Sequence, residues 1–339
     1  MTKIRLLARC NELNIIKCKS KNKGELIKLI EDIIEKNKIE QNNGIIQYNN
    51  IVINTTMNVQ NIKFIDLFCG IGSFHYSFKK MGWECVMACD IDKSAKETYN
   101  YNHKLLPLDD ITKIEPSSIP NYDILCAGFP CQPFSQCGQH KGFDDKRGTL
   151  FFNIIKFVKY HKPKIIILEN VQGLLNHDGG KTFEKIKNDI ENENYTIAYK
   201  VLKCSDYGLP QMRKRLFIVG VRNDIELVKN INKILDLDEY KNEITLTELF
   251  EKKFEKKIAY TIRCGGRNSP INDKHNWDGY IVDGKEYRLT VSDCLKIQGF
   301  NNDFILKGNN KDQLKQLGNT IPTIFTEIIG LNINKYYNS

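Results

Sequence analysis

From residue 62 onward, short apolar runs alternate with segments of helical periodicity, and this alternation limits the folds open to the chain. Helical patterns lie at residues 150–160 and 181–192, for example. The runs typical of buried strands are residues 63–68, 85–89, 123–127, 165–168 and 216–221. The alternation predicts an α/β fold with a doubly wound, mostly parallel sheet and helices on both faces. Ligands of such sheets bind at the carboxyl ends of the strands, so the site is expected in the loops that follow them.

The alternation fails after Val221, and this failure divides the chain. Residues 222–287 are charged and irregular and include a Gly-rich stretch. A domain has about 150 residues as a rule, so a chain of 339 has room for two domains and an appendage. We therefore expect one domain at residues 62–221, completed by residues 312–339, and a second, smaller one at residues 222–311.

The first sixty residues differ in composition from the rest and predict an N-terminal helical extension. Two helical patterns flank the Lys-rich stretch KCKSKNK at residues 17–23, and the second pattern opens with KGELI from Lys23 to Ile27. Residues 1–36 thereby resemble a SAP-type DNA-binding motif, whose second helix starts with K-x-E-L-I. A solvated helical tail is the alternative. The Asn-rich residues 37–61 predict a linker, with a minor strand at residues 51–53.

Charge and composition exclude several classes of protein. No apolar run approaches the roughly 18 residues of a membrane span, and the first residues lack the features of a signal peptide. Eleven cysteines without regular spacing argue against a disulfide framework and for a reducing compartment. We expect an intracellular, non-secreted protein with no metal site and no membrane partner. The net charge of +9 indicates a polyanionic partner.

A first candidate site follows the strand at residues 63–68. Gly70 and Gly72 let a backbone pass close to a ligand, and Asp90 lies 90 − 70 = 20 positions beyond Gly70, where a ribose-binding carboxylate is expected. The third glycine of a dinucleotide fingerprint is missing. The loop therefore predicts a nucleoside-bearing cofactor without distinguishing NAD from S-adenosylmethionine, and a simple tight turn is the alternative.

A second candidate site is the segment GFPCQPFS at residues 128–135, directly after the strand at residues 123–127. Cys131 stands between Pro130 and Pro133 on a stiffened loop, where an active-site nucleophile belongs. The alternative for a free cysteine is a small buried hydrophobe. Further blocks come in order along the chain: ENV at residues 169–171, QMRKR at 211–215, RLT at 288–290, QGF at 298–300 and QLGNT at 316–320.

Together these blocks resemble the DNA (cytosine-5)-methyltransferase family of the bacterial restriction–modification type, from about residue 62 to 335. The resemblance implies a Rossmann-like, S-adenosylmethionine-dependent catalytic domain and a target recognition domain at residues 222–311. The sequence differs from the family pattern at Cys69, Ser73 and the GNTIP sequence of the last block. None of these differences removes a functional group that the chemistry needs.

The resemblance also implies roles for individual residues. Cys131 matches the nucleophile and Glu169 the acid on the cytosine ring, while Arg213 and Arg215 match the two arginines of the Q-x-R-x-R block. The residues implied in binding S-adenosylmethionine are Phe68, Gly70, Gly72, Asp90, Ile91, Asp110, Ile111, Gly128, Pro130, Leu150, Asn319 and Thr320. The candidate DNA contacts are Gln132, Thr261, Arg263 and Arg267. Arg263 and Arg267 suit guanine reading, with phosphate binding as the alternative.

The expected chemistry begins with attack of the Cys131 thiolate on C6 of cytosine, which makes C5 nucleophilic. The target atom lies inside a duplex, so the base must be flipped out. Expected partners are double-stranded DNA and a cognate restriction endonuclease that acts separately from a monomeric enzyme. The alternatives are a tRNA cytosine methyltransferase, a catalytically inactive DNA-binding homologue and a Rossmann dehydrogenase, which would leave the loop around Cys131 without a role.

Overall fold

The computed structural model describes residues 22, 24–28, 45–48, 51–54, 61–130 and 149–337. The chain divides into two units, Met1–Asn58 and Val59–Ser339. In the first unit, residues 24–28 are helical, and Asn22 and Glu25 cap that helix reciprocally. Strands β1 (Ile45–Tyr48) and β2 (Ile51–Asn54) pair in antiparallel fashion, which confirms the minor strand at residues 51–53. The SAP-like motif stays a prediction.

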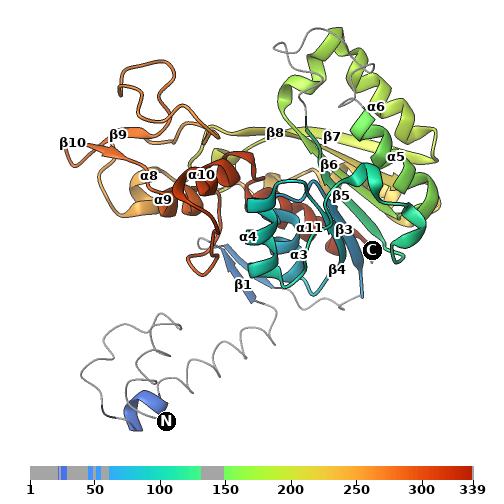
Figure 1. Ribbon diagram of the computed structural model, residues 1–339, viewed down its shortest axis with the longest axis horizontal. Coiled ribbons are helices and arrows are strands. Elements are labelled where there is room, and N and C mark those ends of the chain that lie inside the picture. Colours follow the sequence, from blue (N-terminus) through green and yellow to red (C-terminus); the bar gives the residue numbers. More distant parts are fainter. Residues whose placement is uncertain are drawn as a thin grey trace. The chain divides into compact units, whose positions relative to one another are not determined.

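The second unit is built on a mixed six-stranded sheet with the strand order β4-β3-β5-β6-β8-β7 (Figure 1). Its strands are β3 (Lys63–Leu67), β4 (Glu84–Cys89), β5 (Ile124–Gly128), β6 (Ile165–Asn170), β7 (Tyr195–Lys203) and β8 (Lys214–Arg222). The first four run parallel, whereas β8 is antiparallel to both of its neighbours. The five predicted strands are confirmed. Strand β7 was not predicted, because this edge strand interleaves polar and apolar residues without a continuous apolar run.

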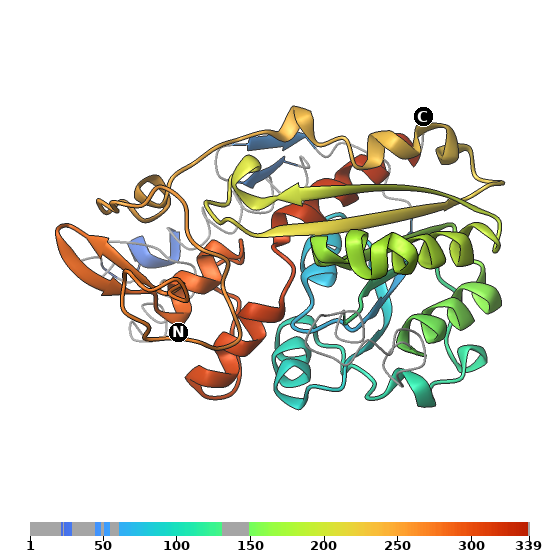
Figure 2. The same ribbon diagram turned by 90° about the horizontal axis from the view of Figure 1, so that it is seen from above.

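Helices cover both faces of the sheet, as the alternation predicted. Helices α5 (Thr149–His161) and α6 (Lys181–Glu191) bury Phe157 and Ile186 in one core with the strands. The other face carries α3 (Ser73–Lys79), α4 (Lys93–His103) and α11 (Thr323–Tyr337). There the rings of Phe217 and Phe325 lie 5.5 Å apart. Figure 2 shows α11 in red and α5 and α6 in green on opposite sides of the long strands β7 and β8.

A separate hydrophobic core is built by residues 246–317 together with Ile71 and Ala95. Its elements are α8 (Leu246–Phe250), the antiparallel hairpin of β9 (Gly279–Val282) and β10 (Lys285–Arg288), α9 (Val291–Ile297) and α10 (Asn310–Asn319). Because Ile71 follows β3, the loop after that strand contacts both cores. Helix α7 (Ile231–Ile234) packs instead on β7, β8 and α11. The domain boundaries at residues 221 and 311 stay predictions.

The position of β3 locates the site. β3 pairs with β4 on one side and with β5 on the other, so the chain changes direction across the sheet at this strand. The loops that leave β3 and β5 diverge there and open a crevice at the carboxyl ends of the strands. In the part of the chain that the structure describes, no helix combines the length and the apolar character needed to cross a bilayer.

Candidate active site

The crevice at the carboxyl ends of the strands is a cavity of about 490 Å³. This volume lies within the range of roughly 300–1,000 Å³ that is typical of small-molecule sites. The loops after β3, β4, β5 and β6 line it, and α10 closes one side. The predicted cofactor residues that line the cavity are Phe68, Gly70, Asp90, Ile91, Gly128, Pro130 and Asn319.

The loop after β3 has an unusual backbone. Phe68, Gly70 and Gly72 all have positive φ angles, of 56°, 55° and 90°. A bulky residue in this conformation is uncommon, and strained backbone of this kind is enriched at functional sites, where the surrounding structure holds it in place. Gly72 caps α3 and does not line the cavity; a Cβ atom there would lie 2.5 Å from the ring of His103. A glycine is therefore needed at position 72 because any side chain would collide with the residues packed against the loop.

Asp90 joins the loops after β3 and β4. Its Oδ2 atom accepts a hydrogen bond from the Gly70 amide at 2.7 Å, and its Oδ1 atom accepts one from the Asp92 amide at 2.8 Å. The two positions that the sequence separates by twenty residues therefore meet. Burial raises the pKa of Asp90, and the amide hydrogen bonds offset part of that rise. Beside it, the side chain of Ile91 is 73% exposed and offers an apolar surface to the cavity.

The other predicted cofactor residues do not line this cavity. Asp110 caps a short 3₁₀ helix (Ile111–Lys113) by accepting a hydrogen bond from the Thr112 amide. Ile111 belongs to the hydrophobic core below α5, and Leu150, on α5 itself, is partly buried against that core. Thr320 lines an adjoining cavity of about 30 Å³, with its hydroxyl 3.0 Å from that of Ser73.

Glu169 and Arg215 form an ion pair on the cavity wall. Glu169 is near the end of β6, and its Oε1 atom lies 2.8 Å from Nε of Arg215. Burial raises the pKa of Glu169, and the nearby Arg215 and Arg213 lower it by less. This carboxyl group therefore retains a proton to higher pH than an ordinary glutamate. Gly128, which pairs with Glu169 across β5 and β6, leaves room beside it: a Cβ atom there would lie 3.6 Å from Oε2.

Arg213 has different surroundings, although it is only two residues from Arg215. It is 1% exposed, and its guanidinium donates to the carbonyls of Ile262 at 3.2 Å, Gly318 at 3.0 Å and Thr320 at 2.8 Å. Burial, with repulsion from Arg215, lowers its pKa to about 9, so it stays charged at neutral pH. The structure brings only Arg215 to the cavity. Arg213 instead ties residue 262 to residues 318–320.

Comparison with known proteins identifies the chain. The model of a family described as C-5 cytosine-specific DNA methylase matches residues 62–282 and 256–335. The chain belongs to this family. It is 35% identical over 309 residues to the type II methyltransferase M.DsaV of Dactylococcopsis salina, covering 83% of this chain and 88% of the relative. It is 32% identical over 312 residues to M.HhaI of Haemophilus parahaemolyticus, covering 82% and 95%.

A solved structure agrees on the fold. The S. pombe Dnmt2 methyltransferase matches with a TM-score of 0.59 at 20% identity, covering 81% of this chain and 99% of that one. The enzyme is therefore a DNA (cytosine-5)-methyltransferase of the type II class with a Rossmann-like fold. This finding removes the dehydrogenase alternative.

The predicted nucleophile of this methyltransferase, Cys131, lies with Gln132 outside the described residues. The preceding residue, Pro130, lines the cavity. Asn170 donates a hydrogen bond from Nδ2 to the carbonyl of Phe129 at 3.0 Å and thereby orients the chain that leads into the nucleophile segment. No role was predicted for Asn170, although its place next to Glu169 in the ENV block was a usable signal.

Several further residues of the methyltransferase cavity were not predicted. They are Ile71, Asp92, Ala95, Phe129, Val171, Gln316 and Gly318. Gln316 and Gly318 lie within the QLGNT block, and Asp92 is an N-cap residue two positions after Asp90, so sequence signals existed for all three. Ala95 lies one turn into α4 and carried no signal.

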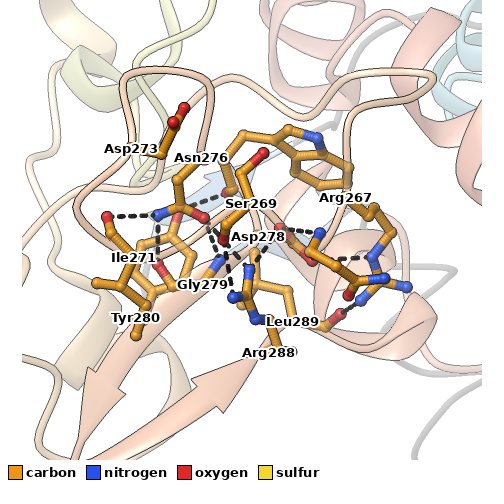
Figure 3. A network of polar contacts seen from close by, with 12 residues as sticks. Arg267, Ser269, Ile271, Asp273, Asn276, Asp278, Gly279, Tyr280, Arg288 and Leu289 are labelled. Atoms are coloured by element: carbon orange, nitrogen blue, oxygen red, sulfur yellow. Dashed lines mark hydrogen bonds and ion pairs between the residues drawn. The ribbon is translucent and has the colours of Figure 1, made fainter.

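The other three predicted DNA contacts follow or flank Ile262, whose carbonyl accepts a hydrogen bond from Arg213. Thr261 is half-buried, and Arg263 is exposed, with no hydrogen-bond or ion-pair partner among the described residues. Arg267 is already engaged: its Nε atom lies 3.0 Å from Oδ2 of the buried Asp278, and its second arm donates to the carbonyl of Leu289 (Figure 3). The sequence predicted the same role for Arg263 and Arg267. In the structure Arg263 is free to contact DNA, whereas Arg267 is bonded within the protein.

Proposed function

We propose that this enzyme transfers the methyl group of S-adenosylmethionine to C5 of a cytosine flipped out of a DNA duplex. In this proposal Cys131 attacks C6 of the base, Glu169 meets N3 and Arg215 meets O2. The observation that carries it is the Glu169–Arg215 pair at 2.8 Å, which shares one cavity with Pro130, the neighbour of Cys131.

The cavity residues fit S-adenosylmethionine. The half-buried carboxylate of Asp90 suits ribose hydroxyls, and the exposed face of Ile91 suits a purine ring. Asn319 at the end of α10 offers an amide to the methionine end. When bound, the cofactor supplies an electrophilic methyl group. The glycine at position 70 lets the ligand approach the backbone closely.

The protein's residues prepare the base for that methyl group. The thiolate of Cys131 forms a bond to C6, the C5–C6 π pair moves to C5, and negative charge develops at N3 and O2. The raised pKa of Glu169 favours the protonated carboxyl group that can donate to N3. Arg215 donates to O2 from a fixed position. After C5 has taken the methyl group, its proton leaves to a base, the S–C6 bond breaks and the Cys131 thiolate is released.

DNA binding has to offset the energy of flipping the base, which is on the order of a few kcal/mol. Phosphate contacts from basic residues offset this energy and make affinity depend on salt. We infer that Gln132, Thr261 and Arg263 contact DNA around the flipped base. We infer further that the enzyme acts as a monomer inside the cell, separately from any cognate endonuclease. Analytical ultracentrifugation with and without duplex tests the monomer.

Methyl transfer tests the proposal directly. Purified enzyme with S-adenosyl-[methyl-³H]methionine is expected to label duplex DNA and not total tRNA. Cys131→Ser is expected to abolish labelling, because an alcohol is a far weaker nucleophile than a thiolate. Cys137→Ser, in the same stretch of sequence, is the matched control and is expected to stay active. Full activity of Cys131→Ser contradicts the mechanism, and labelling of tRNA alone contradicts the substrate.

A second experiment tests the covalent step. A duplex with 5-fluorocytosine in the target site carries fluorine where a proton must leave, so the adduct with Cys131 is expected to persist. Denaturing gel electrophoresis is expected to show a protein–DNA band with the wild type and with Cys137→Ser, but not with Cys131→Ser. Digestion and mass spectrometry then identify the modified cysteine; a label on any other residue contradicts the assignment.

A further inference from the structure

A loop of the recognition part is held from below by consecutive buried residues. This loop, residues 263–275, is followed directly by Asn276 and Trp277, which are 3% and 1% exposed. Trp277 donates from Nε1 to the carbonyl of Gly265 at 2.8 Å, and Asn276 donates from Nδ2 to the carbonyl of Ile271 at 3.2 Å. The loop therefore has a fixed base at two points along its length.

Asp278 supplies a third and stronger attachment (Figure 3). Its fully buried carboxylate accepts from Nε of Arg267 at 3.0 Å and from a terminal nitrogen of Arg288 at 3.1 Å. The Nη2 atom of each arginine donates to a backbone carbonyl near the other arginine. Arg267 donates to Leu289 at 2.6 Å, and Arg288 donates to Ser269 at 2.8 Å. One anion thus holds two cations, and the cations cross-link the 263–275 loop to the end of β10.

Away from this base the loop contacts α10 through Cys264, whose Sγ atom donates to Oδ1 of Asn319 at 2.8 Å, and it carries exposed side chains. Arg263, Lys274 and His275 are exposed. Gly265 has an ordinary φ angle, and a Cβ atom there would meet nothing within 4 Å. Nothing in the described structure therefore requires a glycine at this exposed position. Close approach of an external backbone would require one.

We propose that Asp278 is a positioning residue for DNA recognition: it commits Arg267 and Arg288 to an internal brace and leaves DNA contact to Arg263 and the bare backbone at Gly265. This inference rests on the proposed contact between residues 261–267 and DNA, and it removes Arg267 from the residues that touch DNA. The brace keeps the loop in one shape, so that one base sequence fits it better than its near relatives.

Arginine substitutions separate contact from support. The probe is a duplex with the site found by bisulfite sequencing of plasmid DNA that the wild type has methylated. Arg263→Gln is expected to leave Tm unchanged and either to lower the slope of log Kd against log salt by about 0.9, or to relax discrimination at one base position roughly fivefold or more. Arg267→Gln is expected to lower Tm and leave the salt slope unchanged. Lys285→Gln, an exposed cation on the neighbouring hairpin, is the matched control.

Substitution of the anion tests the brace itself. Asp278→Asn is expected to raise the Kd for the duplex roughly tenfold and to reduce discrimination against single-mismatch sites, with the Kd for S-adenosylmethionine unchanged. The double variant Asp278→Asn/Arg267→Gln is expected to lose less than the sum of the single losses, because Asp278→Asn alone leaves Arg267 without its anion and the second change removes that unpaired cation. Asp283→Asn, on the exposed turn of the hairpin, is the control.

Three outcomes overturn the inference. If Asp278→Asn lowers Tm but still discriminates against single-mismatch sites as well as the wild type does, Asp278 is merely structural. Arg267→Gln that changes the salt slope at unchanged Tm makes Arg267 a DNA contact. If Asp278→Asn fails to fold, Gly265→Ala decides: it is expected to keep Tm and weaken duplex binding, and unchanged binding contradicts the proposal. Failure of the proposed function itself appears separately, as a wild-type enzyme that transfers no methyl group to DNA.

Discussion

The two arginines of the Q-x-R-x-R block are expected to fail in opposite ways when each is replaced by lysine. Arg213 donates three charge-assisted hydrogen bonds from a fully buried position, whereas Arg215 pairs with Glu169 on the cavity wall. A lysine at position 213 retains one of the three bonds at most. Each lost bond to a charged donor is worth about 1.5–3 kcal/mol, so Arg213→Lys is expected to cost about 3–6 kcal/mol. Proteins have total stabilities of roughly 5–15 kcal/mol, so this is a large part of the whole.

In a thermal melt this loss corresponds to a Tm lowered by at least roughly 6 °C. Methyl transfer by Arg213→Lys is expected to recover on cooling, because the variant is folded at low temperature. Arg215→Lys is expected to melt closer to the wild type, since the lysine ammonium still provides a cation for Glu169, and to lose roughly 100-fold to 1,000-fold in kcat at every temperature.

The assay is differential scanning fluorimetry paired with single-turnover methyl transfer between low and physiological temperature. The reasoning is refuted if Arg213→Lys melts within roughly 2 °C of the wild type and still loses a hundredfold in rate, because Arg213 would then act on the reacting base. Arg222→Lys is the control: Arg222 is half-buried and pairs with the exposed Asp224, and the change is expected to alter neither quantity strongly.

Three further predictions concern buried and exposed groups near the cavity. Asp66 is 1% exposed without a hydrogen-bond partner for either carboxylate oxygen in the described structure, and burial followed by repulsion from Asp90 raises its pKa. The contribution of Asp66 to stability therefore falls as the pH rises above about 4, and the stability of Asp66→Asn relative to the wild type in urea melts is expected to increase with pH by at most about 1.36 kcal/mol per unit; a constant difference contradicts this. The raised pKa of Glu169 predicts that kcat/KM falls as the pH rises through that pKa, and that Glu169→Gln removes this limb of the profile; an unchanged limb assigns it to another group. Ile91→Ser is expected to leave Tm unchanged, because the side chain is 73% exposed, and to weaken S-adenosylmethionine roughly tenfold by calorimetry; an unchanged Kd removes Ile91 from the cofactor site.

The sequence was informative where short-range patterns determine structure. Continuous apolar runs located the parallel strands, and the twenty-residue interval from Gly70 to Asp90 anticipated two groups that lie 2.7 Å apart. The edge strand β7 escaped prediction because its inner and outer residues alternate without an apolar run.

What the sequence could not supply was the partner of each side chain. Arg213 and Arg215 are alike in type and two positions apart, yet one is enclosed by three carbonyls and the other faces Glu169. Arg263 and Arg267 are likewise indistinguishable in sequence, and only the position of Asp278 separates them. Contacts such as Arg215 with Glu169, 46 positions apart, and Arg213 with Thr320, 107 positions apart, follow from packing, which no local pattern encodes.

The reversed direction of β8 has a consequence for how the chain must be routed. Because β8 runs against β6, its first residues lie beside the end of β6, and the strand then carries the chain nine residues, or about 30 Å, away from the site. Asn223, just after β8, donates a backbone hydrogen bond to Asn194, at the end of the sheet away from the site. Asn242 donates one to Asp206, just after β7, at the end of the sheet near the site. Residues 224–241 therefore run back alongside the sheet, from the end away from the site to the end near it. The length of this stretch is set by the length of β8. An insertion that lengthens β8 would therefore have to be matched by a longer segment between β8 and α8, which begins at Leu246.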